Sequence, residues 1–299
     1  MKKNNFLFFL VFAGIVFFDF AKAIDTVATG FKVLIGNTAM IDAYSICKRI
    51  TNNRSNDLFV PTATSNEWLQ FRNNLPTNVI DNGLCNDSYT KLLLHFDNNF
   101  SDSSSSGHSI SPTGAVISAS QYRYGVTSGY FDGSGDYLYL SDSNDWDWDT
   151  GDFTIDTWVR FVSFPNTAWF YWQGIPGNSG DYQYMQYDTG TSRLNWGYVS
   201  GNVTKAAYSI PWTLSYNTWY HIAFVRNGSS GTFYINGVSQ TTTVDTAFTG
   251  SLSGLTGNIW IGKHGYGDGL AGGGHLNGYL EEFRFSKGIA RWTTNFTPP

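Results

Sequence analysis

The chain has few charged residues, and glutamate is the scarcest of them. Only 14% of the 299 residues are Asp, Glu, Lys or Arg, and the three glutamates are Glu67, Glu281 and Glu282. Cleavage of a glycosidic bond needs two carboxyl groups at a defined separation. Glu281 and Glu282 are adjacent, so on a strand they point to opposite faces and cannot act on one bond. The scarcity of glutamate argues against a polysaccharide-cleaving enzyme.

Other catalytic patterns are missing as well. The sequence has no Gly-x-Ser-x-Gly elbow and no His-Glu-x-x-His motif. Asp152 and Asp156 are four residues apart on one predicted strand and share a face, but solvent-facing polar residues are the simpler interpretation of that pair. We therefore expect no catalytic residues and no enzymatic activity.

Basic clusters are also lacking, which excludes one class of partner. The chain has 18 Lys and Arg against 23 Asp and Glu. Without residues 1–23 the balance is 15 against 22, because three Lys and one Asp are removed. A net charge of −7 with no Lys/Arg cluster has no electrostatic means of gripping phosphates, so nucleic acid is not an expected partner.

Cysteine and proline are rare, whereas aromatic residues and glycine are abundant. There are 8 Pro against 32 Gly, and 17% of residues are aromatic. Many aromatics with frequent Gly, Asn and Ser turns indicate an all-β protein. Cys47 and Cys85 are the only cysteines. In an exported protein such a pair predicts a disulfide, the alternative being two free buried thiols.

Residues 1–23 have the composition of a cleaved secretory signal. Lys2 and Lys3 precede an apolar run from Phe6 to Phe18, and Ala21-Lys22-Ala23 follows. Thirteen apolar residues are short for a membrane span, although an uncleaved anchor is the alternative. We expect cleavage after Ala23, a secreted location (extracellular or periplasmic), and no membrane contact of the mature chain.

Residues 24–88 differ from the remainder, since they contain both cysteines and the only helix-like spacing. Apolar residues between Ala39 and Ile46 suit a helix that ends near Cys47, and Glu67–Phe71 suits a short amphipathic helix behind a Ser or Thr cap. The pattern predicts a small α-rich module, and a disulfide between Cys47 and Cys85 would stabilise so small a unit.

Residues 89–299 read as strands and turns throughout. The segment 153–161 alternates strictly, with Phe153, Ile155, Thr157, Val159 and Phe161 on one face. Residues 129–133 and 137–140 suggest a strand pair around a glycine turn. About a dozen strands in some 210 residues fit one large sandwich. Further strands are expected near 92–96, 169–173, 182–187, 192–198, 206–211, 258–262 and 278–285.

The stretch Asn217–Val238 is the most regular part of this domain. It reads as two strands joined by Asn227–Gly231, with a second turn at Asn236-Gly237, a dipeptide that favours a type I′ hairpin. Both faces of its first strand are largely apolar. Such a strand is expected to be covered on both sides, in the middle of a sandwich.

With the strands placed, residues 90–297 resemble the laminin-G-like jelly roll of the concanavalin A-like lectin/glucanase superfamily, of the bacterial and phage type. The resemblance implies an all-β, two-sheet antiparallel jelly-roll sandwich that binds ligands more often than it catalyses reactions. The segments that carry the resemblance are Leu92–Asp97 with Asp102-Ser103, Phe131–Leu138, Gly151–Arg160, the Asn217–Val238 hairpin, and Gly278–Phe285 followed by Gly288–Trp292.

The resemblance also implies a structural calcium ion, because members of the family often carry one between the first and last strands. The matching positions are Asp97, Asp102 and Glu281. Calcium prefers several oxygen ligands, and carboxylates supply them. The alternative is that the Asp residues only cap turns.

The candidate ligand site rests on aromatic residues between Trp169 and Tyr198. Sugar rings stack on exposed aromatic faces, and nearby amides such as Gln173, Gln183, Gln186 and Asn195 can orient hydroxyl groups. We predict a non-catalytic binding protein for a glycan or a surface protein; a structural subunit of a surface or virion appendage is the alternative. The predicted ligand-binding residues are Trp172, Tyr182, Tyr184, Trp196 and Tyr198.

Overall fold

The computed structural model describes residues 87–163, 167–177, 180–265 and 274–299. It also describes the backbone of six short strands before residue 87. The chain divides into two units, Met1–Asn86 with Pro299, and Asp87–Pro298. The predicted boundary at residue 89 lies two residues from this division. In the described part of the chain, no helix has the length and apolar character needed to cross a membrane.

The first unit has strands where the sequence predicts helices. The helix expected over 67–71 is wrong: this segment is a strand paired with 57–61, and 39–41 is likewise a strand. In Leu69–Arg72 apolar and polar residues alternate, which suits strand pairing, whereas the five residues of β6 are too few for a stable helix. The disulfide predicted between Cys47 and Cys85 lies outside the described residues and stays a prediction. The strands are β1 (Phe8–Val11), β2 (Gly14–Phe17), β3 (Val33–Ile35), β4 (Ala39–Ile41), β5 (Asp57–Pro61) and β6 (Trp68–Arg72).

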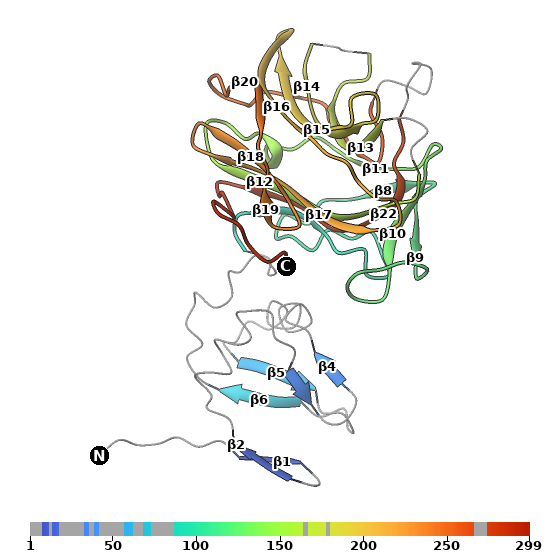
Figure 1. Ribbon diagram of the computed structural model, residues 1–299, viewed down its shortest axis with the longest axis vertical. Coiled ribbons are helices and arrows are strands. Elements are labelled where there is room, and N and C mark those ends of the chain that lie inside the picture. Colours follow the sequence, from blue (N-terminus) through green and yellow to red (C-terminus); the bar gives the residue numbers. More distant parts are fainter. Residues whose placement is uncertain are drawn as a thin grey trace, which may run out of the picture. The chain divides into compact units, whose positions relative to one another are not determined.

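The second unit is a sandwich of two antiparallel sheets (Figure 1), as the sequence predicts. The first sheet has the order β19-β18-β17-β12-β22-β10-β9, and β7 pairs with the C-terminal half of β22. Its strands are β7 (Thr90–Leu94), β9 (Val116–Ser118), β10 (Ser128–Asp132), β12 (Phe153–Phe161), β17 (Trp219–Asn227), β18 (Ser230–Ile235), β19 (Val238–Ser239) and β22 (Asn277–Lys287).

The second sheet has the order β20-β16-β15-β14-β13-β21-β11-β8. One 3-10 turn, η1 (Asn144–Trp146), precedes β12 and is capped by Ser143, which accepts a hydrogen bond from the Asp145 amide. The strands are β8 (Ser111–Thr113), β11 (Tyr137–Leu140), β13 (Ala168–Gly174), β14 (Tyr182–Asp188), β15 (Arg193–Ser200), β16 (Val203–Pro211), β20 (Thr243–Thr246) and β21 (Asn258–Ile261).

The core lies between the two sheets and is rich in aromatic residues. Phe153, Ile155, Val159 and Phe161 all belong to it, which confirms the alternation predicted for β12. From the second sheet, Trp196 stacks on Phe224 of β17 with ring centroids 4.6 Å apart. Burial of so many large apolar side chains is the main force that holds the sheets together.

One predicted pairing is wrong. Segments β10 and β11 do not form a hairpin: β10 pairs with β22 and β9, and β11 pairs with β21 and β8. The chain therefore crosses from one sheet to the other at residues 133–136. There the buried Asp136 carboxylate accepts a hydrogen bond from the Asp132 amide at 2.8 Å. Two glycines with positive φ, Gly133 and Gly135, allow the tight crossing.

The outer face of the first sheet is covered over β17 and β18, as the two apolar faces of β17 predict. Ala223, Val225 and Tyr234 form a second apolar cluster, against which Trp292 and Phe296 of the C-terminal segment pack. Trp292 and Phe296 stack face to face at 3.9 Å. The C-terminal segment therefore takes the place of a ligand over these two strands.

Candidate functional site

A row of aromatic residues crosses the outer face of the second sheet. Strand register places Tyr139 opposite Trp260, Trp260 opposite Trp172, and Trp172 opposite Tyr184. The next residue in the row, on β15, is Gly197. These side chains point away from the core because their neighbours along each strand, such as Ile259 and Ile261 beside Trp260, belong to it.

Two tyrosines of this face form a flat surface, which we call the tyrosine platform (Tyr182 and Tyr184). Their rings are 5.9 Å apart with only 29° between planes, and both side chains are partly exposed. A Cβ at position 197 would lie 2.7–2.9 Å from the Tyr184 ring, so the ring rests on the space that Gly197 leaves. Burial raises the pKa of Tyr184 to about 12, so its hydroxyl stays protonated and able to donate at neutral pH.

A polar row runs beside the tyrosine platform, two residues further along the strands. Register aligns Trp169, Gln186, Asn195 and Ser209 in that order. Asn195 donates to the Arg193 carbonyl at 3.2 Å, and the Arg193 guanidinium donates to Ser209 at 2.8 Å. Amide and hydroxyl groups next to a stacking surface are the arrangement that carbohydrate recognition requires.

The prediction is wrong for two of the five ligand-binding residues, which lie in the core, and a third is largely covered by its neighbours. Trp196 and Tyr198 belong to the core and are fully buried, because β15 turns its glycine outward and its large rings inward. Trp172 is on the outer face but is 1% exposed, between Tyr182 and Trp260. Only Tyr182 and Tyr184 of the predicted five are accessible.

Two amides near these aromatic residues also serve the core and not a ligand. Gln183 accepts from the Trp148 indole at 2.6 Å and donates to the Trp146 carbonyl at 3.0 Å and to Gln173. Gln173 donates to the Gly257 carbonyl at 3.1 Å. This network satisfies the polar atoms that the buried faces of β13 and β14 carry, so these amides have no hydrogen bonds to spare for a sugar.

Sequence reasoning missed Trp260 and Tyr139 on the outer face. Trp260 alternates with Ile259 and Ile261, which is a local signal that it faces away from the core. That it meets Trp172 depends on the pairing of β13 with β21, strands about 90 residues apart in the chain. No local pattern contains this information.

The acidic pair on β12 is not a catalytic pair. Asp156 is buried and bonded to Arg284 at 2.9 Å and to His221 at 3.3 Å, while Asp152 accepts the Gly228 amide at 2.7 Å. The expectation that both face solvent is therefore wrong for Asp156. A carboxylate held in a buried ion pair is not free to transfer protons.

The predicted calcium ligands divide into two groups. The Asp102 carboxylate accepts hydrogen bonds from the amides of Leu93, Ser104 and His108 and from the Ser104 hydroxyl, so it caps its own loop. Burial is the main cause of the raised pKa of Glu281, and the negative charge of Asp97 adds to it. Across the described residues, no group of three or more His, Cys, Asp or Glu side chains is placed to hold a metal.

Calcium binding by Asp97 and Glu281 remains a prediction. If it occurs with the millimolar to submillimolar affinity of extracellular modules, 10 mM Ca²⁺ should raise the melting temperature by a few degrees relative to EGTA. Asp97→Asn should abolish that shift, and Asp132→Asn, at an exposed turn, should leave it. An equal melting temperature in Ca²⁺ and EGTA would contradict the prediction.

The buried Glu281 predicts an unusual dependence of stability on pH. Burial raises its pKa from 4.5 to about 8. The backbone amides of Arg123 and Tyr124, which donate to the carboxylate at 2.8–3.0 Å, lower the pKa but do not offset the effect of burial. Between these values the folded protein binds more protons than the unfolded chain. Without calcium, the free energy of unfolding should fall as pH rises from 5 to 8, by at most about 1.4 kcal/mol per unit.

Urea denaturation at several pH values measures this slope. Glu281→Gln should reduce the slope, because Gln cannot ionise but can still accept the two amides. Asp132→Asn is the control and should keep the native slope. A native slope in Glu281→Gln would show that another group is responsible.

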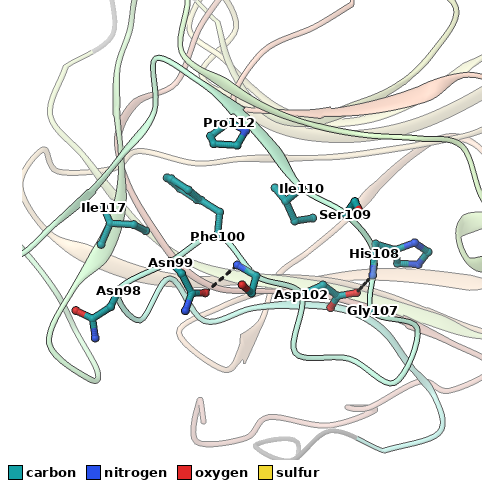
Figure 2. A pocket seen from close by; sticks show the side chains of 11 residues that line it. Asn98, Asn99, Phe100, Asp102, Gly107, His108, Ser109, Ile110, Pro112 and Ile117 are labelled. Atoms are coloured by element: carbon teal, nitrogen blue, oxygen red, sulfur yellow. Dashed lines mark hydrogen bonds between the residues drawn. The ribbon is translucent and has the colours of Figure 1, made fainter.

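A hollow of about 660 Å³ lies at the edge of the sandwich, between the loop 98–110 and strands β8 and β9 (Figure 2). Phe100, Ile110, Pro112 and Ile117 form its apolar side, and Asn98 and Asn99 lie at one end. At the other end His108 is held by Asp145 at 3.0 Å and contacts the Trp146 ring. This mixed lining does not select a class of ligand.

Comparison with known proteins identifies the family. The model of the concanavalin A-like lectin/glucanases superfamily matches residues 132–290, more than half of the chain, so the protein belongs to this superfamily. No curated protein sequence matches significantly.

Solved structures of low identity share the fold. Domain 4 of AbnA, a GH43 extracellular arabinanase from Geobacillus stearothermophilus, in complex with arabinotriose, has a TM-score of 0.51 and 16% identity, over 67% of this chain and 92% of that one. The botulinum neurotoxin serotype C1 binding domain has a TM-score of 0.51 and 15% identity, over 68% of this chain and 50% of that one. The serotype D/C binding domain has a TM-score of 0.50 and 15% identity over the same shares.

Proposed function

We propose that this protein is a secreted, non-catalytic binding protein that recognises carbohydrate through the outer face of its second sheet. The observation that carries the proposal is the tyrosine platform: two partly exposed, nearly parallel rings with the amides of Gln186 and Asn195 in the adjoining row. A stacking surface beside polar groups that can orient hydroxyls is the usual form of a sugar site.

Other observations support the proposal. The AbnA domain, which shares the fold, is described in complex with arabinotriose, and the signal-like residues 1–23 suit export. The aspartates considered for catalysis have structural partners, which favours binding over bond cleavage. A surface protein is the alternative ligand, and a structural subunit of an appendage is the alternative role.

Binding to a panel of soluble polysaccharides, measured by affinity electrophoresis and calorimetry, tests this function. Tyr184→Ala should weaken binding about tenfold, because a stacked ring contributes roughly 0.5–1.5 kcal/mol beyond its buried area. Tyr122→Ala removes an equally aromatic exposed ring, next to Arg123 at the first sheet, and should bind as the native protein does.

Two outcomes would contradict the carbohydrate function. One is the absence of binding to every polysaccharide in the panel. The other is native affinity in Tyr184→Ala. Stable oligomers in light scattering together with no glycan binding would instead support the structural role.

A further inference from the structure

Trp169 and Gln186 carry two buried polar atoms that have no hydrogen-bond partner. The atoms are the indole nitrogen Nε1 of Trp169, a donor, and the amide oxygen Oε1 of Gln186, an acceptor. The two residues are directly opposite each other on β13 and β14, on the outer face of the sheet. Such a pair has Cβ atoms about 5 Å apart. Buried polar atoms are nearly always bonded, so two neighbouring exceptions call for an explanation.

Both residues border the tyrosine platform. The centroids of the Trp169 and Tyr184 rings are 5.6 Å apart, and their planes meet at 61°. The Trp169 ring therefore stands steeply at the border of the tyrosine platform. On its other side Trp169 contacts the His264 ring at 5.1 Å. Asn195 follows Gln186 in the polar row. A ligand stacked on Tyr184 therefore has the Trp169 and Gln186 side chains at its edge.

We propose that Trp169 and Gln186 together read one hydroxyl group of a neutral saccharide, an inference that rests on the proposed carbohydrate function. A hydroxyl oxygen can accept from the indole N–H and donate to the amide oxygen at the same time. A carboxylate or phosphate lacks the proton to donate, and an ammonium group lacks a lone pair to accept. Both side chains are partly exposed, and the proposal includes a small shift of the two side chains on binding that turns their polar atoms to the ligand.

If Trp169 and Gln186 serve a ligand and not the fold, their substitution should weaken binding without a matching loss of stability. In the free protein the unpaired atoms destabilise the fold, and their replacement by apolar groups of similar shape removes that penalty. Gln186→Leu should therefore leave the melting temperature unchanged or higher, Trp169→Phe should lower it only by the packing lost with the smaller ring, and both should weaken ligand binding. Gln183 provides the matched control, because it lies on the same strand, is buried towards the core and has all its polar atoms bonded. Gln183→Leu should lower the melting temperature.

The experiment uses the full chain, with arabinan, galactan and xylan as neutral probes and polygalacturonate as the acidic probe. Calorimetry should show tighter binding to a neutral polymer than to polygalacturonate. Both kinds of polymer carry hydroxyl groups, but each galacturonate adds a carboxylate whose charge the Trp169 and Gln186 side chains cannot neutralise. Trp169→Phe and Gln186→Leu should each weaken that binding about fivefold to tenfold, because each variant loses one hydrogen bond to the ligand hydroxyl.

The outcomes separate this inference from the function on which it rests. Loss of binding in Tyr184→Ala with native affinity in Trp169→Phe and Gln186→Leu would overturn the inference and leave the function standing. Preference for polygalacturonate would do the same, and so would melting temperatures lowered as far as in Gln183→Leu. No binding of the native chain to any probe would overturn both.

Discussion

Asp156→Asn is expected to lower the free energy of unfolding by about 3–5 kcal/mol, because it leaves a buried guanidinium without its counter-charge. Asp156 and Arg284 are 2% and 3% exposed. The two oxygens of Asp156 accept from Nε and Nη2 of Arg284, each at 2.9 Å, and His221 lies 3.3 Å from one of them. The Trp292 ring lies over the guanidinium at 5.7 Å.

Urea denaturation at pH 7 measures this loss, with Asp245→Asn as an exposed control. Burial alone would raise the pKa of Asp156, but Arg284 and His221 hold it below its usual value. The ion pair therefore contributes fully above the unfolded pKa of 3.8, and its contribution is lost as pH falls through the folded pKa. The difference between the native protein and Asp156→Asn should shrink in acid. A loss below 1 kcal/mol at pH 7 would contradict the buried ion pair.

Trp196→Ala is expected to destabilise the protein by a comparable amount, about 3–5 kcal/mol, through the cavity it leaves in the core. Trp196 is fully buried, and its indole donates to the Tyr171 hydroxyl at 2.9 Å. That hydroxyl bonds in turn to Gln183 at 3.3 Å. The substitution therefore removes a stacked ring and interrupts the polar network inside the sandwich.

Trp196→Phe separates the two effects, since it keeps a ring and removes the hydrogen bond, and it should cost about 1 kcal/mol plus a smaller packing term. Chemical denaturation measures both variants, and Tyr184→Ala is the comparison on the opposite face of the same sheet. If Trp196→Ala were as stable as the native protein but unable to bind glycans, Trp196 would belong to the ligand site and the placement in the core would be wrong.

The strands of the sandwich were predictable because alternation is a local property. The segment that became β12 shows its period-2 pattern within nine residues, and the segments that became β14 and β17 are short runs rich in aromatic or β-branched residues. The strands that were missed, β8, β9, β19 and β20, are two to four residues long, and β8 contains Pro112. Such short edge strands carry too little pattern to detect, and proline is common on edges.

The candidate site was predictable only in part. Alternation states that Tyr182 and Tyr184 share one face and that Trp196 and Tyr198 share another, but it does not state which face meets the core. Both faces of β14 and β15 carry large or aromatic side chains. The Trp196 face is the one that meets the core, because Trp196 packs on Phe153 and Phe224 of the other sheet.

The sequence by itself determined the class of fold, the position of the main strands and the scarcity of glutamate, because each depends on composition or on neighbours along the chain. The tertiary structure alone decided which rings form the tyrosine platform and that Asp156 is an ion-pair partner. Those two properties depend on strands that pair across distances of about 90 residues or more. Such pairings are chosen by the packing of the whole core and not by any local pattern.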